Sequence, residues 1–536
     1  MSSRRVWKAT VTVLAVAVTA RLLPLFWTPY PFNPDGFMFA AQARDTIATG
    51  TLTGAGIGPH GYVFPTLLAI AASVTGVAPL WLAQPSIAVV GALPPVLAVL
   101  LVWRCTPLST QQERVAIAAT AAGLTLALEG IYLRRTVTVS YEVLGLLFVV
   151  LLAIGSQRVL RTRRLAWVLV TATFLLVLPI THHLSTFMAA LTLVGLVGLA
   201  VARDGRAAFG PGLALLAPFW LYIGGYYALT QPPYAAELAT KPGLFVAWVI
   251  VLGAGAQWLT RASARNARLT VGTVAVGGFS ILGANAVWGL FPGTATTPPQ
   301  LLVYVAPLTV LAALACWGLP LGIGRVGTRA VVAALLVAPI AWVGFAVTAG
   351  VDPVYADFAR RGQTFVHLAS VVCAGVAIPA LVRRWSPPVT PVVAVGLPLL
   401  LCFCALASLP LAFAGLEALA YQGTTTPAEF ETATFAATTL GDDWTSDDHV
   451  TRVARNYYET GASPQPAYSW LQGNALRCST VMQRSWQTVG AQRYPSSPLA
   501  LESSIYTETS ATNHVVYTTT SPDPLTLVVP RAGSTC

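Results

Sequence analysis

The repeated apolar runs of bilayer length limit what this chain can fold into. A transmembrane helix needs about 20 mainly apolar residues, and the 536 residues contain thirteen runs that approach or reach this length. Only 10% of the residues are charged, against roughly a quarter in soluble domains. The sequence predicts a polytopic α-helical membrane protein with about 13 transmembrane helices. We expect them at 7–27, 81–103, 115–131, 143–155, 165–179, 185–202, 210–229, 244–258, 269–291, 301–321, 330–349, 366–382 and 389–414.

The positions of Lys and Arg predict the side of the membrane on which each loop lies. More than half of the 31 Lys and Arg fall in one set of alternating connections, which contains only two acids, Glu113 and Asp204. Short basic loops stay cytoplasmic. We therefore expect a cell-membrane protein with a cytoplasmic N-terminus and an extracytoplasmic C-terminus. The net charge of +11 then reflects membrane sidedness, and we expect no nucleic-acid partner. The basic positions lie within 4–8, 104–114, 158–164, 203–206, 261–268, 325–329 and 383–384.

The short apolar segment 62–78 decides the orientation of everything after it. It is flanked by Pro65 and Pro79 and carries several hydroxyl side chains. If it crossed the membrane, the basic loops after it would lie outside, against the rule just used. We expect it to lie in or dip into the outer interface, within a first outer loop at 28–79, although the residues alone leave a crossing open.

The region 422–536 differs from the rest of the chain. It is rich in Thr and Ser and contains no membrane-length apolar run, so we divide the chain into a membrane domain at 1–421 and a small extracytoplasmic α/β domain at 422–536. A capping-box pattern from Thr426 to Glu429 predicts one helix start, and Ser446 predicts another. The segments 514–520 and 525–529 are expected to form two strands joined by a turn.

Two of the seven cysteines, Cys478 and Cys536, fall in this outer region. Oxidising conditions outside the cytoplasm let a disulfide persist, so we expect them to pair. The alternative is two free thiols packed in a small core.

Asp35 is the main catalytic candidate. It lies in an Asn-Pro-Asp-Gly stretch directly after the first apolar run. A carboxylate held at the membrane surface can act as a base on a substrate that arrives from water. The alternative is a simple turn, because Pro, Asp and Gly are common turn residues.

Arginines on the outer side are candidate phosphate ligands. Arg binds phosphate in a bidentate manner, which Lys does less well. Their alternative roles are snorkelling to the interface and pairing with the aspartates of the same loop. The outer arginine pairs are Arg134 with Arg135, and Arg360 with Arg361.

Four further polar residues are candidates for binding substrate. Arg21 lies inside the first helix, where a charge usually faces a polar cavity or else snorkels to the interface. His182 and His183, in a turn between two spans, can bind metal, orient a carboxylate or bond phosphate; a merely polar turn is the alternative. Glu142 is a second candidate carboxylate, unless it only caps its helix.

The sequence lacks several catalytic signatures. We find no Walker A motif, no Rossmann fingerprint after a strand, no His-Glu-x-x-His and no Gly-x-Ser-x-Gly. A primary pump is therefore not expected. If the protein is an enzyme, a lipid-linked donor is the simplest source of an activated group.

This arrangement resembles the GT-C class of membrane glycosyltransferases, which take a sugar from a polyprenyl or dolichyl phosphate. The resemblance rests on FNPDGFMFAAQARD after the first helix, on the interfacial segment leading to a span that ends in Arg, and on THHLSTF and ARRGQTF. It covers residues 1–414 as architecture. Within the class, the chain is most similar to archaeal dolichyl-phosphate-mannose mannosyltransferases of surface-layer N-glycosylation. It lacks the Trp-Trp-Asp-Tyr-Gly motif of oligosaccharyltransferases, and the Asp-Glu pair that protein O-mannosyltransferases carry in the first loop.

The resemblance implies an inverting transfer in which Asp35 is the general base. The sugar, mannose by this resemblance, would move from the lipid phosphate to an extracytoplasmic glycan, lipid-linked or protein acceptor. The resemblance leaves a divalent metal ion open. Two other functions remain: a secondary transporter or lipid flippase, whose buried charges line a pathway, and a scaffold whose outer domain binds a partner.

Overall fold

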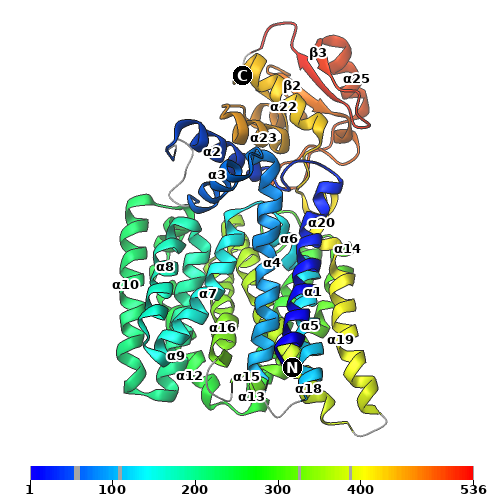
Figure 1. Cartoon of the computed structure of the whole chain (residues 1–536). Coiled ribbons are helices and arrows are strands. Elements are labelled where there is room, and N and C mark those ends of the chain that lie inside the picture. The colour runs from blue at the N-terminus through cyan, green and yellow to red at the C-terminus, as the bar shows by residue number, and fades with distance from the viewer. Residues whose placement is uncertain (1, 53–60, 107–110, 324–327, 386–388, 535) are drawn as a thin grey trace.

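The computed structural model describes residues 2–52, 61–106, 111–323, 328–385, 389–534 and 536. Part of the first outer loop and Arg325 of the basic loops lie outside these residues. A bundle of long helices carries a smaller domain at one end, and the two chain termini lie at opposite ends of the molecule (Figure 1).

The membrane bundle comes close to the expected thirteen spans. Within the described residues, ten helices are long and apolar enough to cross a membrane, or twelve if each of two bent pairs is one span. The 17-residue helix α8 (Leu165–Thr181) is apolar but shorter, and it lies beside these helices in Figure 1. The predicted fold class is confirmed. The single spans are α1 (Ser2–Leu22, continued by η1, Leu23–Phe26), α4 (Pro79–Cys105), α7 (Tyr141–Thr162), α9 (His183–Asp204), α10 (Arg206–Thr230), α12 (Pro242–Arg261), α13 (Ala264–Trp288), α16 (Thr328–Ala349), α17 with η2 and α18 (Pro353–Gly362, Gln363–Phe365, Val366–Val382) and α19 (Val389–Ser408).

The two bent pairs are α5 (Gln112–Leu128) with α6 (Gly130–Val137), and α14 (Pro299–Val305) with α15 (Leu308–Ile323). The first pair bends by 60° at Glu129. The Glu129 carboxylate accepts hydrogen bonds from the N–H groups of Ile131 and Tyr132 and pairs with His367 at 2.8 Å. Because this side chain caps α6, a new helix starts in a new direction, and α6 lies near the end of the bundle that carries the outer domain (Figure 1).

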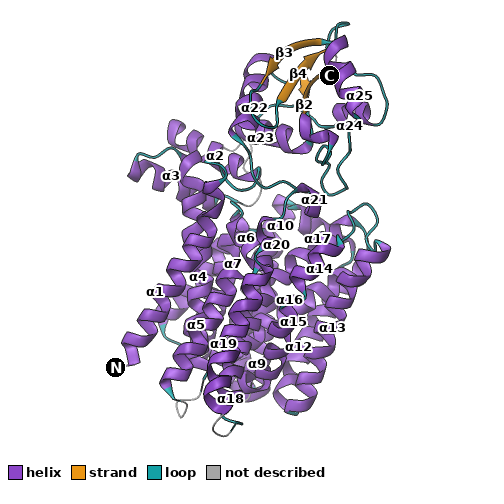
Figure 2. Cartoon of the chain, turned by 90° about the vertical axis from the view of Figure 1, so that its right-hand side faces the viewer, coloured by secondary structure: helices purple, strands orange, loops and turns teal. Residues whose placement is uncertain are grey.

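The first outer loop forms two helices, α2 (Asp35–Thr49) and α3 (Val63–Thr75). Both lie at the outer-domain end of the bundle, and α3 does not run among the spans (Figures 1 and 2). The Tyr62 N–H donates to the Ile180 carbonyl near the end of α8, at 3.2 Å. Short helices also occupy this end: α11 (Pro233–Thr240), α20 (Pro410–Phe413) and α21 (Leu416–Leu419).

The outer domain contains a four-stranded sheet with strand order β1-β2-β4-β3, shown in orange in Figure 2. β1 (Trp444–Thr445) is parallel to β2 (Ser479–Gln483). The expected pair of strands is present as β3 (His514–Thr518) and β4 (Leu525–Val529), which are antiparallel, and β4 is antiparallel to β2. The sequence analysis missed β1 and β2. The helices are α22 (Pro427–Leu440), α23 (Asp448–Tyr458), α24 (Gln465–Leu471), η3 (Arg484–Gln487) and α25 (Ser503–Thr512).

The helix starts of the outer domain are built by side chains. The predicted capping box between Thr426 and Glu429 is present at the start of α22. The second predicted start is wrong by one residue: Asp447, not Ser446, caps α23 by accepting from the Val450 N–H at 3.0 Å. Ser446 instead donates to the Val481 carbonyl at 2.8 Å, because the neighbouring strand β2 offers it an acceptor.

A disulfide joins Cys478 to Cys536, with their Cα atoms 4.8 Å apart. It ties the C-terminal residue to the position just before β2. The five remaining cysteines are free.

The outer domain and the first outer loop share a hydrophobic core. Tyr30 and Phe37 of the loop pack in one buried cluster with Val450 and Val453 of α23. The Asn456 amide also donates to the Pro34 carbonyl at 3.0 Å. This packing fixes the start of α2 between the membrane bundle and the outer domain.

Candidate active site

Asp35 lies at the first position of α2, half-buried, where several bonds fix the backbone before it. Asn33 has a φ of 117°, a conformation that is uncommon for residues other than glycine and costs energy. It is held there because its N–H donates to the Gly423 carbonyl at 2.7 Å, and its Oδ1 accepts from the Asp35 N–H at 3.3 Å. These bonds fix the backbone from which the Asp35 carboxylate extends.

Gly36 explains how closely this loop approaches the bundle. A Cβ at this position would lie 2.5 Å from Pro31 Cβ and 3.0 Å from Val139 Cβ. The connection between α6 and α7 is bound to the same loop, since the Val139 N–H donates to the Phe32 carbonyl at 3.0 Å. The backbone beside Asp35 is thus packed against the segment that leads to Glu142.

Arg360 and Arg361 of α17 are gathered around Asp357. Arg360 Nη2 lies 2.5 Å from Asp357 Oδ1, and Arg361 Nε lies 3.0 Å from Asp357 Oδ2. The alternative pairing with an aspartate of the same loop is therefore present. Arg361 also lies 3.7 Å from Glu142 Oε2, and the Tyr234 hydroxyl donates to Asp357. Because an arginine has five N–H donors, both keep donors for a ligand.

The two histidines border this cluster of charges. The His183 ring lies 4.3 Å from the Tyr234 ring in an edge-on arrangement, and the His182 ring lies 5.0 Å from the Tyr141 ring. His182 Nδ1 is 2.8 Å from Ser185 Oγ. Glu142 does not cap α7, because Ser140 does so by accepting from the Glu142 N–H.

Aromatic residues outside the bundle connect the cluster to Asp35. Arg360 donates to the Tyr494 hydroxyl and stacks on that ring at 5.5 Å. The Tyr494 ring lies 5.3 Å from Tyr421, whose hydroxyl donates to Asn33 Oδ1. A continuous row of contacts thus runs from α17 through the outer domain to the Asp35 loop.

The electrostatics also couple Asp35 to this row. Burial raises the pKa of Tyr421, and the Asp35 carboxylate raises it further. Burial would lower the pKa of Arg452, but Asp35 and Asp448 outweigh this effect and raise it. Asp35 therefore acts on a phenol and a guanidinium that both lie at the outer domain.

The structure places the remaining candidates differently. Arg21 is fully buried, and it donates to Thr136 Oγ1 at 2.6 Å and to the Ala17 carbonyl at 2.9 Å. It holds α1 to α6 and does not face the cluster. Arg134 donates to the Ala414 carbonyl at 3.2 Å and lies over Tyr421 at 5.9 Å. The charge of Arg135 acts on Asp357 of the cluster.

The sequence analysis missed several members of this site. Asp357 entered only as an alternative partner for arginine, and four others did not enter: Tyr234, Tyr421, Arg452 and Tyr494. The tyrosines and arginines in the polar outer segments could have indicated a binding site, because both side chains bind sugars and phosphates. What the pattern could not show is that they lie together.

Metal ligation is not apparent in the described residues. Among them, no three His, Cys, Asp or Glu side chains come together in a group that could hold a metal ion.

No protein-family model matches the chain, and no curated protein matches it by sequence. Solved structures do match. The fold is similar to that of an archaeal oligosaccharyltransferase. The apo enzyme of Archaeoglobus fulgidus superposes with a TM-score of 0.53 at 12% sequence identity, covering 86% of this chain and 65% of that chain. The present chain thus spans about two thirds of the oligosaccharyltransferase.

Two other solved structures superpose less closely on this chain. The same oligosaccharyltransferase, AglB, in complex with an inhibitory peptide and a dolichol-phosphate gives a TM-score of 0.49 at 14% identity, covering 86% and 64% of the two chains. ArnT from Cupriavidus metallidurans bound to undecaprenyl phosphate gives 0.35 at 14% identity, covering 98% and 99%. The structural neighbours are membrane glycosyltransferases of the GT-C class. At such low identity, the likeness to the apo enzyme establishes the GT-C fold alone.

Proposed function

We propose that this protein is an integral membrane glycosyltransferase that moves a sugar from a dolichyl or polyprenyl phosphate to an acceptor on the outer face of the membrane. One observation carries the proposal. A half-buried carboxylate, Asp35, is fixed at the same end of the bundle as Arg360 and Arg361, and Tyr494 and Tyr421 connect the two. On a GT-C fold, this arrangement supports a role for Asp35 as base and for the two arginines as phosphate ligands.

The reaction needs one base and a stabilised leaving group. Asp35 takes the proton of the acceptor hydroxyl. The acceptor oxygen attacks the anomeric carbon from the face opposite the lipid phosphate, and a new C–O bond forms with inversion. The old bond between carbon and phosphate oxygen breaks, and its electron pair leaves with the phosphate. Arg360 and Arg361 stabilise the charge that develops on that phosphate. Glu142 and Asp357 hold Arg361 in position.

The finer assignments follow from the same proposal. The donor sugar is mannose, as the resemblance of the sequence implies, and the acceptor is a glycan, lipid-linked or protein hydroxyl. The chain divides into the membrane domain at 1–421 and the extracytoplasmic domain at 422–536. Because the basic loops are assigned to the cytoplasm, the site faces the outside, where the outer domain receives the acceptor.

The test is transfer by the purified protein. It is incubated with dolichyl phosphates that carry labelled mannose, glucose or glucosamine, and loss of label from the lipid fraction is followed. Removing a general base costs about 10²-fold or more in rate, so Asp35→Asn is expected to lose at least that much. Asp45→Asn is the matched control, since Asp45 lies on the same helix but pairs with Arg44 at 2.8 Å.

The control variant is expected to transfer sugar at about the wild-type rate. A folded, membrane-inserted Asp35→Asn protein that is fully active would contradict the role of Asp35. Absence of transfer from every labelled lipid, with the wild-type protein and a range of glycan acceptors, would contradict the proposed reaction itself.

A further inference from the structure

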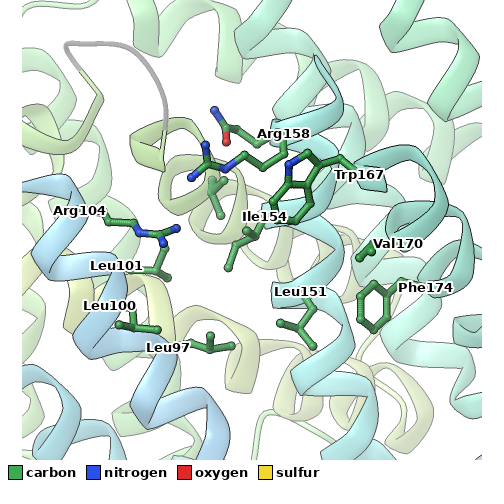
Figure 3. A pocket seen from close by; sticks show the side chains of 12 residues that line it. Leu97, Leu100, Leu101, Arg104, Leu151, Ile154, Arg158, Trp167, Val170 and Phe174 are labelled. Atoms are coloured by element: carbon green, nitrogen blue, oxygen red, sulfur yellow. The ribbon is translucent and has the colours of Figure 1, made fainter. Parts of the chain in front are cut away.

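A cavity of about 220 Å³ lies between α4, α7 and α8 (Figure 3). It is at the end of the bundle far from the candidate active site. α4 begins beside the outer domain, where Leu80 packs in the shared core, and Arg104 lies roughly 35 Å further along the same helix. α7 likewise begins at the active site with Glu142 and ends beyond Arg158. The active site does not use this cavity.

The cavity is polar at its mouth and apolar along its walls. On α4, Leu97 and Leu101 line it below Arg104; on α7, Leu151 lines it below Arg158. These spacings of three, four and seven residues place each set on one face of its helix. The distance from Leu97 to Arg104 is about 10 Å along the helix. This depth suits a charged group with the start of an apolar chain beneath it.

The two arginines face the same space without a counter-ion. Figure 3 shows the Arg104 and Arg158 side chains extending towards each other from facing helices. Arg104 is exposed and Arg158 is half-buried, with its guanidinium 5.8 Å from the Trp167 ring centre. Neither belongs to any ion pair among the described residues. Two facing cations repel each other, and an anion between them would relieve this repulsion.

The walls exclude several other occupants. An apolar cavity does not hold ordered water well, because water needs two to four polar partners. Val170, which lines the cavity on α8, is 43% exposed on the outer surface of the bundle, so the cavity is open sideways to the lipid. The helix dipole is another reason for an arginine near a helix C-terminus. It does not explain why the Arg104 and Arg158 side chains extend into the same space.

We propose that this cavity binds an acidic membrane phospholipid, with its phosphate between Arg104 and Arg158 and the start of one acyl chain against Leu97 and Leu151. Basic pockets between transmembrane helices recognise anionic headgroups in this way. The site is independent of the glycosyltransferase proposal, because it needs neither the donor nor Asp35.

The proposal is tested on the full chain, purified in detergent and stripped of lipid. Native mass spectrometry measures binding of phosphatidylglycerol and of phosphatidylcholine with the same acyl chains. The wild-type protein is expected to prefer phosphatidylglycerol. Because each Arg attracts an anionic headgroup, the double variant Arg104→Gln/Arg158→Gln should lose about tenfold or more in affinity for it.

A matched control removes two charges at the same end of the bundle but outside the cavity: Arg161→Gln/Arg164→Gln. It should keep the preference for phosphatidylglycerol. A loss equal to that of the cavity variant would show general surface attraction and overturn the proposal. Equal binding of phosphatidylcholine by the wild-type protein would overturn it too, as would stronger binding of polyprenyl phosphate or displacement by inorganic phosphate.

A second variant keeps the test decisive if the first does not fold. Leu151→Trp fills the apolar part of the cavity and leaves both arginines in place. Correct folding is checked by size-exclusion chromatography and by thermal unfolding in detergent. The variant is expected to bind phosphatidylglycerol several-fold more weakly than the wild-type protein. Unchanged binding would show that no acyl chain enters the cavity.

Discussion

Arg361 shows how single residues build the candidate site. Its guanidinium lies within 4 Å of two carboxylates, those of Asp357 and Glu142, and 5.9 Å from the centre of the Tyr234 ring. The Asp357 contact is a local pair four residues away on α17, whereas Glu142 and Tyr234 come from α7 and α11, so no local pattern predicts the last two. A planar, permanently charged group can make all three contacts at once, which a lysine ammonium cannot.

Arg361→Lys is therefore expected to raise the KM for the lipid-phosphate donor about tenfold or more, while the protein still folds. A lost hydrogen bond to a charged group is worth about 1.5–3 kcal/mol, which gives this range. Arg203→Lys is the control, because Arg203 pairs with Asp204 on the far side of the membrane and should leave the KM unchanged. Steady-state transfer at varied donor concentration measures both. An unaltered KM in Arg361→Lys would favour a purely structural arginine.

Among the elements, the pair α7 and α9 sets the relation between Glu142 and the histidines. The two helices approach closely because position 145 has no side chain: a Cβ there would lie 2.1 Å from Ser185 Oγ. Ser185 is also the hydrogen-bond partner of His182. The close helix contact therefore lies directly beneath the site.

Gly145→Ala should destabilise the protein and slow transfer. An added methyl group in a packed core costs about 1–3 kcal/mol. The clash with Ser185 can be removed only if the Ser185 side chain moves away from His182. Gly224→Ala is the matched control on α10, since nothing lies within 4 Å of a Cβ there. That change should be neutral or slightly stabilising, because Ala is the better helix former. Thermal unfolding and transfer rate are compared for both; equal behaviour would rule out close packing at Gly145.

At the scale of the whole molecule, the outer domain and the membrane bundle both contribute residues to the proposed site. The domain contributes Tyr494 and Arg452, the bundle contributes α17 and α7, and the first outer loop is packed in the domain's own core. The position of Asp35 depends on both parts. A disturbance in the domain is thus expected to reach Asp35, the proposed base.

The arrangement of the termini gives a topological prediction. Because the basic loops are expected in the cytoplasm, a reporter cysteine after Arg164 should react only from inside and one after Gln422 only from outside. Membrane-impermeant thiol reagents on intact cells and on inverted vesicles measure this. Reaction of both positions from the same side would contradict the thirteen-span arrangement.

Loss of the disulfide is expected to destabilise the outer domain. Cys478 and Cys536 are 58 residues apart, and closing such a loop restricts the unfolded chain by about 4 kcal/mol. Cys536→Ser should therefore lower the unfolding temperature of the domain, whereas Cys402→Ser, at a free thiol in the bundle, should not. Adding a reductant to the wild-type protein should reproduce the first effect. Quantitative labelling of both thiols in the untreated folded protein would show that the bond is absent.

The local and compositional features of this protein follow from its sequence. The lengths of the apolar runs determine the spans. Lipid offers no hydrogen-bond partner to backbone N–H and C=O groups, so each run must form a helix that pairs them internally. Side-chain chemistry determines the capping box at Thr426, and the β3–β4 hairpin follows from two segments rich in β-branched residues joined by a Ser-Pro-Asp-Pro turn. These features depend on residues close together in the chain.

Only the tertiary structure decided which residues meet. Strands β1 and β2 escaped prediction because β1 is two residues long and β2 is buried along its whole length, so neither shows alternation. Arg21 and Arg361 were both candidate substrate ligands in the sequence. The first is bonded wholly within the bundle and the second faces the site, because packing of distant helices, and not the residue type, determines where a side chain points.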